Sequence, residues 1–236
     1  MAVSAPCRLL ATMTVKMVIC LEDVSAALER LDEAYGGRSL ITDLVISNED
    51  ARTQMLQKTN LRGLNGLIGL MNPAHYGEIA PLAFCQLLHE VQAEAGEMFY
   101  DLGSGNGKLV ALAWLLGLDV TGVEIIRERH ETAMVALETL RKGMEDDDLP
   151  SAPIRFICGS FLDVDFSDAD IVYTWDLLFD QEMKEDIAVI AQKLKPGSRV
   201  ISSRGLPIPG FSEPKRFYCH DFRKETAPHE FAIQKK

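Results

Sequence analysis

From residue 81 onwards, the apolar positions of this chain alternate between short continuous runs and runs with helical spacing. The short runs predict buried β-strands, which we expect at residues 98–102, 120–124, 154–158, 171–175 and 200–203. The helical spacing predicts amphipathic helices at residues 81–95, 109–116, 127–142 and 180–194. Strands that alternate with helices are typical of an α/β fold with a mostly parallel sheet and helices on both faces. We expect residues 217–236 to add an antiparallel hairpin at one edge.

The N-terminal part of the chain has a different pattern of apolar residues. Residues 24–35 carry apolar side chains at the i, i+3, i+4 and i+7 positions of an amphipathic helix. Glycines and leucines then alternate over residues 61–71 and lead into an Asn-Pro pair, which is a turn or boundary signal. We therefore expect a helical N-terminal extension over residues 1–71 and one larger domain over residues 72–236.

Composition excludes several classes of protein. The chain has 236 residues with 24 Lys and Arg against 35 Asp and Glu, a net charge of −11, so we expect no strong nucleic-acid binding. Its 47% of hydrophobic residues is ordinary globular usage. The five cysteines are scattered without a CxxC pair, which argues against a disulfide framework or a zinc site and favours a reducing compartment.

The sequence also bears on location. The longest uncharged stretch, residues 63–77, is 15 residues long, shorter than the roughly 20 apolar residues of a membrane-spanning helix. We therefore expect no membrane association. Residues 1–20 contain Arg8 and Lys16 and no acid, which leaves mitochondrial targeting open as the less favoured alternative. We expect a cytoplasmic or nuclear protein.

A glycine-rich loop follows the first predicted strand, where residues 101–107 read Asp-Leu-Gly-Ser-Gly-Asn-Gly. In parallel sheets such a loop borders the ligand crevice. Lys108 stands where a dinucleotide fingerprint needs its third glycine, and no Gly-Lys-Ser/Thr follows, so the loop matches neither that motif nor a P-loop. Glu124, at the end of the second strand, can accept hydrogen bonds from ribose hydroxyls. Together they indicate a nucleoside-containing ligand without a pyrophosphate, whereas a tight turn and a solvated carboxylate are the structural alternatives.

This loop resembles motif I of the class I S-adenosylmethionine-dependent methyltransferases. Leu-Lys-Pro-Gly at residues 194–197 resembles a short motif that those enzymes carry before their fifth strand. Further segments resemble the disruptor-of-telomeric-silencing type of histone-lysine methyltransferase, which lacks a SET domain. These segments are residues 76–78, 122–124, 159–162 and 200–203. The resemblance implies a Rossmann-like fold, S-adenosyl-L-methionine as cofactor and a protein lysine, or another nitrogen nucleophile, as methyl acceptor.

The resemblance also assigns residues to the cofactor. In that family a Tyr-Gly-Glu loop closes over the methionine end and a phenylalanine stacks near adenine, roles that fall here on Tyr76, Glu78 and Phe161. Ser160 stands where the family has an aspartate that holds the adenine amino group, and a serine can hydrogen-bond there more weakly. The expected cofactor-binding residues are Tyr76, Glu78, Asp101, Gly103, Ser104, Gly105, Gly107, Glu124, Ser160 and Phe161.

The residues expected around the methyl acceptor differ most from the family's sequence pattern. Where the family has two asparagines followed by phenylalanines, residues 173–179 read Tyr-Thr-Trp-Asp-Leu-Leu-Phe. We predict Trp175 and Asp176 as the catalytic residues, with Trp175 in an aromatic wall that lowers the pKa of an acceptor amine by desolvation and Asp176 orienting that amine. The alternatives are a core tryptophan and a helix cap. No metal is expected, because the five histidines show no ligand spacing.

Several functions fit these features. A methyltransferase acting on a protein lysine is favoured, and an acidic chain suits a basic protein substrate better than a small molecule. A small-molecule methyltransferase and a binding or scaffold subunit of the same fold remain alternatives. A nucleotide-dependent oxidoreductase is disfavoured by the glycine spacing.

Overall fold

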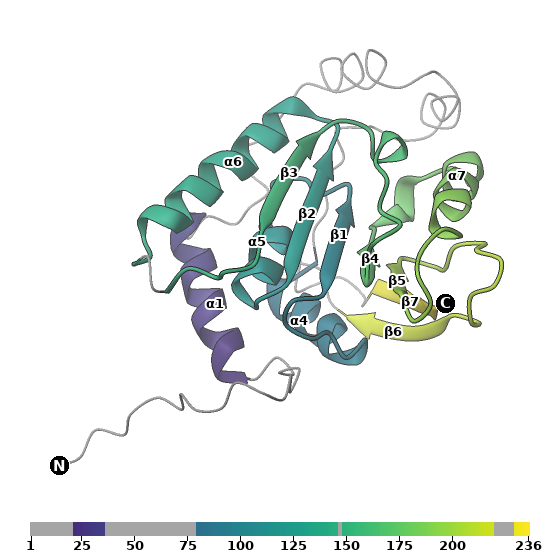
Figure 1. The fold of residues 1–236 in the computed structure, drawn as a ribbon, viewed down its shortest axis with the longest axis horizontal. Helices are drawn as coiled ribbons and strands as arrows, with labels where there is room; N and C mark the ends of the chain where they lie inside the picture. Colours follow the sequence, from purple (N-terminus) through teal and green to yellow (C-terminus); the bar gives the residue numbers. More distant parts are fainter. Residues whose placement is uncertain (1–20, 36–78, 146–147, 220–228) are drawn as a thin grey trace.

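Seven strands form one mixed sheet in the computed structural model, which describes residues 21–35, 79–145, 148–219 and 229–236 (Figure 1). The strands are β1 (Met98–Leu102), β2 (Asp119–Glu124), β3 (Ile154–Cys158), β4 (Ile171–Tyr173), β5 (Arg199–Ser202), β6 (Lys215–Cys219) and β7 (His229–Lys235). Their order is β3-β2-β1-β4-β5-β7-β6. The first five are parallel, and β7 pairs antiparallel with both β5 and β6. The predicted mostly parallel sheet and its antiparallel hairpin are confirmed.

Helices cover both faces of this sheet, as predicted. One apolar core is shared by α1 (Leu21–Ala34), α4 (Pro81–Glu90), α5 (Lys108–Leu115) and α6 (Arg127–Lys142). The core on the opposite face is formed with α7 (Gln181–Ala191). Because side chains alternate along a strand, Phe99 of β1 enters the first core and Tyr100 the second.

The N-terminal helix packs on the body of the domain. Ala27 and Leu31 of α1 are buried in the first core, where the helix contacts α4, α5 and α6. The predicted helix within residues 24–35 is thus confirmed. Most of the predicted extension, including residues 36–71, lies outside the described residues. The boundary at residue 71 therefore stays a prediction.

Three elements end two or more residues earlier than the sequence predicts. The helix that begins at Pro81 ends at Glu90 rather than near residue 95, because Gln92 adopts a left-handed φ of 53°. The Ala93 N–H then bonds to the Leu88 carbonyl at 2.9 Å, which closes a Schellman-type cap. The fourth strand ends at Tyr173 rather than at residue 175, and α7 ends at Ala191 rather than at residue 194.

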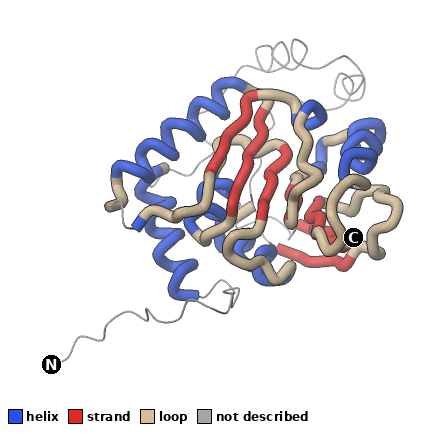
Figure 2. Tube along the Cα trace, viewed as in Figure 1, coloured by secondary structure: helices blue, strands red, loops and turns tan. Residues whose placement is uncertain are grey.

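A loop instead of a helix connects β3 to β4 across the second face of the sheet (Figure 2). Its only helical part is the 3-10 turn η2 (Phe161–Asp163). Phe166 fills the space beneath this loop, fully buried, with its ring 6.2 Å from that of Tyr100. Burial, and after it the neighbouring Asp168 carboxylate, raise the pKa of Tyr100. This face is therefore closed by loop side chains.

Candidate functional site

The strand order reverses between β1 and β4, and this reversal locates the candidate site. In an open parallel sheet, the loops that leave the carboxyl ends of such strands separate and form a ligand crevice. Thr174 holds the two strand ends together, because its buried Oγ1 donates to the Leu102 carbonyl at 3.1 Å. Its backbone amide donates to the Ile201 carbonyl of β5 at 3.0 Å, so Thr174 joins the ends of β1, β4 and β5.

Hydrogen bonds within the protein fix the shape of the glycine loop that follows β1. The Gly103 and Ser104 amides both donate to the Val123 carbonyl, at 2.9 and 3.0 Å. The Gly105 amide donates to the Glu124 carboxylate at 2.8 Å, and the Gly107 amide to the Ser104 carbonyl at 2.9 Å. The loop is therefore preorganised against the end of β2.

Two glycines of the loop are required for different reasons. A Cβ at Gly107 would lie 2.6 Å from Ala133 Cβ and 2.6 Å from the Phe156 ring, so this glycine permits close packing beneath the loop. A Cβ at Gly103, where φ is +98°, would meet nothing within 4 Å. Gly103 therefore keeps backbone exposed on the open side of the loop, where a ligand can approach closely.

Glu124 is the last residue of β2 and is 5% exposed. One carboxylate oxygen accepts from the Gly105 amide and the other from the Ile126 amide, each at 2.8 Å. Because each carboxylate oxygen has two acceptor positions, one position on each oxygen remains for two vicinal hydroxyls. Asp101 is also buried, one strand away in β1, where it pairs with Gly122.

Ser104 turns away from the open side of the loop. A Cβ at Gly122 would lie 2.9 Å from the Ser104 hydroxyl and 2.8 Å from Val110, so that hydroxyl occupies the space above β2. Gly122 is therefore a mid-strand glycine that makes room for the loop. Any contribution of Ser104 to ligand binding comes from its backbone.

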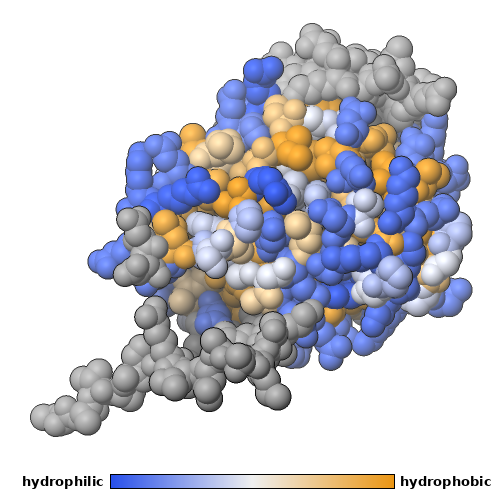
Figure 3. Space-filling model, viewed as in Figure 1, coloured by the Kyte–Doolittle hydropathy of each residue, from blue (hydrophilic) through white to orange (hydrophobic). Residues whose placement is uncertain are grey.

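Residues 159–161 border the other side of Glu124. The Gly159 amide donates to the Glu124 carbonyl at 3.0 Å. The Ser160 hydroxyl accepts from the Leu162 amide at 3.2 Å and so starts the turn that presents Phe161. The Phe161 ring lies 5.5 Å from that of Phe179 at an angle of 32°. Apolar side chains gather near these strand ends and towards α7 in Figure 3.

The predicted acceptor residues follow β4. Trp175 is half-buried, with its ring edge-on to Phe231 at 5.8 Å. Asp176 is fully buried; it accepts a hydrogen bond from the Ser203 amide and lies 3.1 Å from the Lys184 ammonium. Asp176 thus ties the end of β4 to the end of β5 and to α7.

Asp180, and not Asp176, is the side-chain cap of α7, because its carboxylate accepts a hydrogen bond from the Met183 amide at 2.8 Å. The predicted roles of Trp175 and Asp176 toward the acceptor stay predictions. Tyr76 and Glu78 lie outside the described residues.

Sequence reasoning missed several residues that shape this site. Thr174 and Lys184 act through contacts between distant elements, and Tyr35 of the N-terminal helix reaches the glycine loop. Only Gly122 carried a sequence signal, since a glycine inside a strand often marks a close approach.

A metal-ligand cluster and a membrane-spanning helix were both sought among the described residues. No three His, Cys, Asp or Glu side chains there converge to hold a metal ion. Within the same ranges, no helix combines the length and apolar character needed to cross a membrane.

A parallel sheet with an antiparallel β7 inserted between β5 and β6, and a glycine loop facing an acid on β2, define the Rossmann-like class I methyltransferase fold. The family model of the histone methylation protein DOT1 matches residues 70–218, and the chain belongs to this family. The predicted family resemblance is confirmed.

Individual proteins match this chain at low sequence identity and over only part of its length. A histone-lysine N-methyltransferase, H3 lysine-79 specific, of Kluyveromyces lactis is 28% identical in a match of 145 residues that covers 58% of this chain and 25% of that protein. This chain therefore spans about a quarter of the length of that relative. A protein-lysine N-methyltransferase of Saccharolobus islandicus is 29% identical over 50% of this chain and 68% of its own length. The O-methyltransferase cnsE of Penicillium expansum is 31% identical over 45% of this chain and 37% of its own.

Proposed function

We propose that this chain is an S-adenosylmethionine-dependent methyltransferase that transfers a methyl group to a lysine side chain of a protein. The observation that carries the proposal is the preorganised glycine loop, which has open space at Gly103 and bonds the buried Glu124 carboxylate through the Gly105 amide. Membership of a histone methylation family supports the lysine acceptor.

The crevice residues fit an adenosyl cofactor. The free acceptor positions of Glu124 suit the two ribose hydroxyls, and the missing side chain at Gly103 lets the ligand reach the loop backbone. Phe161, supported by Phe179, offers an aromatic surface to adenine beside Glu124. When bound, S-adenosylmethionine supplies a methyl group already activated on a sulfonium. The chain's own residues therefore need only to bind, orient and exclude water.

The acceptor amine must lose its proton before it can attack. An apolar environment disfavours the ammonium form and lowers the pKa of a lysine that enters it. Trp175, packed on Phe231 next to the end of β1, supplies such a wall. Asp176 is already held by Ser203 and Lys184, so we assign it to positioning this wall. A protein acceptor in the cytosol or the nucleus fits this proposal, and a histone acceptor would make it nuclear.

A methyl-transfer assay tests the proposal. Full-length chain is incubated with S-adenosylmethionine carrying a labelled methyl group and, separately, with free histones, nucleosomes and a cell lysate. We expect label in protein, on the Nε atom of lysine by mass spectrometry of the digest, and none with a Glu124→Ala chain. Because the chain has a net charge of −11, free basic proteins should accept more label than nucleosomes, whose surface is largely anionic DNA. Transfer to no protein in any arm would refute the lysine acceptor.

A small-molecule methyltransferase is the second candidate, because a fungal O-methyltransferase matches 45% of the chain. The same assay separates the two functions. Label that stays in the low-molecular-weight fraction of the lysate, with none in protein, would favour this second candidate. Absence of transfer from a chain that still binds cofactor would favour a scaffold subunit.

A further inference from the structure

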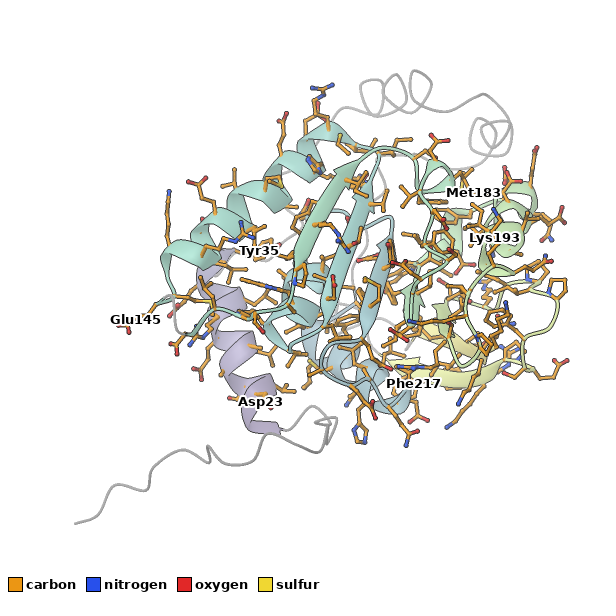
Figure 4. The ribbon with its side chains drawn as sticks, in the orientation of Figure 1. Asp23, Tyr35, Glu145, Met183, Lys193 and Phe217 are labelled. Atoms are coloured by element: carbon orange, nitrogen blue, oxygen red, sulfur yellow. The ribbon has the colours of Figure 1, made fainter. Side chains whose placement is uncertain are left out.

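The N-terminal helix brings a tyrosine to the glycine loop. In Figure 4, Asp23 and Tyr35 mark the two ends of α1, and Tyr35 lies at the end next to α6. Its hydroxyl donates to the Asn106 carbonyl at 2.8 Å, a contact between residues 71 positions apart in sequence. Nothing in the proposed chemistry requires α1, so this contact needs its own explanation.

The contact holds one peptide unit of the loop from both sides. The Asn106 carbonyl belongs to the same peptide plane as the Gly107 amide, which donates to the Ser104 carbonyl at 2.9 Å. This peptide immediately precedes Lys108, where α5 begins, and Asn106 itself is 2% exposed. With both of its polar groups bonded, the peptide cannot rotate without losing a hydrogen bond.

A second contact fixes the tyrosine ring. The Lys108 ammonium lies 5.8 Å from the centre of the Tyr35 ring, within the range of a cation–π interaction. The helix does not depend on either contact for its own attachment, because Ala27 and Leu31 are 3% and 2% exposed in the core. Removal of the hydroxyl should therefore change the loop and leave α1 in place.

We infer that Tyr35 is a positioning residue for the cofactor, which makes the N-terminal helix part of the cofactor site. The inference rests on the proposed function. Tyr35 holds the 106–107 peptide, and through it the loop that presents Gly103 and Gly105 to the ligand. Its loss weakens cofactor binding and leaves the acceptor side, beyond β4, unchanged.

The test compares two tyrosines in the full chain. Tyr35→Phe removes the hydroxyl and keeps the ring, and Tyr218→Phe removes the hydroxyl that donates to Glu230 at 3.2 Å on β6. Titration with S-adenosylhomocysteine should give an about three- to tenfold higher Kd for Tyr35→Phe, the range expected for one lost hydrogen bond, and no change for Tyr218→Phe. With the acceptor found above, KM for the cofactor should rise by the same factor at unchanged kcat.

The outcomes separate the inference from the proposed function. Equal Kd values for wild type and Tyr35→Phe overturn the inference, whereas a wild-type chain that binds no S-adenosylhomocysteine overturns the proposed function. If Tyr35→Phe does not fold, Tyr35→Gln replaces it, since its polar side chain is too short to place a donor where the tyrosine hydroxyl meets the Asn106 carbonyl. A raised Kd then supports the inference, and an unchanged Kd overturns it.

Discussion

The two glycines that bracket the loop provide a sharp test of the site, because alanine should affect them in opposite ways. At Gly107 the new Cβ would lie 2.6 Å from both Ala133 Cβ and the Phe156 ring, in the interior beneath the loop. At Gly103 it would meet no protein atom within 4 Å and would extend into the crevice. We therefore expect Gly107→Ala to damage the fold and Gly103→Ala to damage ligand binding.

The magnitudes follow from the contacts. Overpacking costs about 1–3 kcal/mol, and a left-handed backbone costs an alanine about 1 kcal/mol more, so Gly107→Ala should lose about 2–4 kcal/mol. For a chain of this size, each kcal/mol lowers Tm by about 2–4 °C, which gives a loss of about 4–16 °C. Gly103→Ala bears only the backbone cost, about 1 kcal/mol, and should lose about 2–4 °C.

The assay is thermal unfolding with and without saturating S-adenosylhomocysteine. Gly197→Ala is the matched control, because Gly197 also has a positive φ and open space around it but lies before β5, away from the crevice. It should melt like Gly103→Ala and keep the wild-type rise in Tm on ligand addition. A full ligand-induced rise in Gly103→Ala, or a Gly107→Ala chain as stable as wild type, would refute this reasoning.

Three further predictions concern buried groups. Arg199→Met leaves the Glu97 carboxylate buried without its ion-pair partner and should lower the free energy of unfolding in urea by about 3–5 kcal/mol; a loss below about 1 kcal/mol contradicts this. Glu124→Gln turns an amide N–H towards a backbone N–H and should raise the Kd for S-adenosylhomocysteine at least about tenfold in calorimetry, whereas an unchanged Kd would exclude the carboxylate from the site. Burial raises the pKa of Cys85 to about 11, so roughly one Cys85 thiol in a thousand is ionised at pH 8. Iodoacetamide should therefore modify the exposed Cys158 before Cys85 in peptide mapping, and equal rates for these two would argue against a buried Cys85.

The repeating elements of this fold could be predicted because their signals are local. Apolar runs and helical spacing placed β1, β3 and α6 at the residues where they occur. The end of α4 at Glu90 could not be predicted, because the left-handed residue that follows it is Gln92 rather than a glycine. The end of β4 at Tyr173 was missed for another reason, because bulky strand-forming residues continue in the sequence to Trp175.

In the candidate site, too, some features could be predicted from the sequence and others could not. The placement of Asp101, Gly103 and Glu124 at neighbouring strand ends could be predicted, because loop spacing brings them there in any parallel sheet of this order, and their role toward a cofactor stays a prediction. The contact of Tyr35 with Asn106 spans 71 positions and depends on where α1 packs, which no local pattern encodes. The ion pair of Asp176 with Lys184 likewise becomes visible only when α7 is in place.

The central claim, that the crevice beside Glu124 holds an adenosyl cofactor, is tested most directly by a crystal structure of the chain with saturating S-adenosylhomocysteine. We predict both ribose hydroxyls within hydrogen-bonding distance of the Glu124 carboxylate, with the nucleoside lying over Gly103 and adenine beside Phe161. A crevice that stays empty at saturating ligand, or ligand density elsewhere on the chain, would contradict the account.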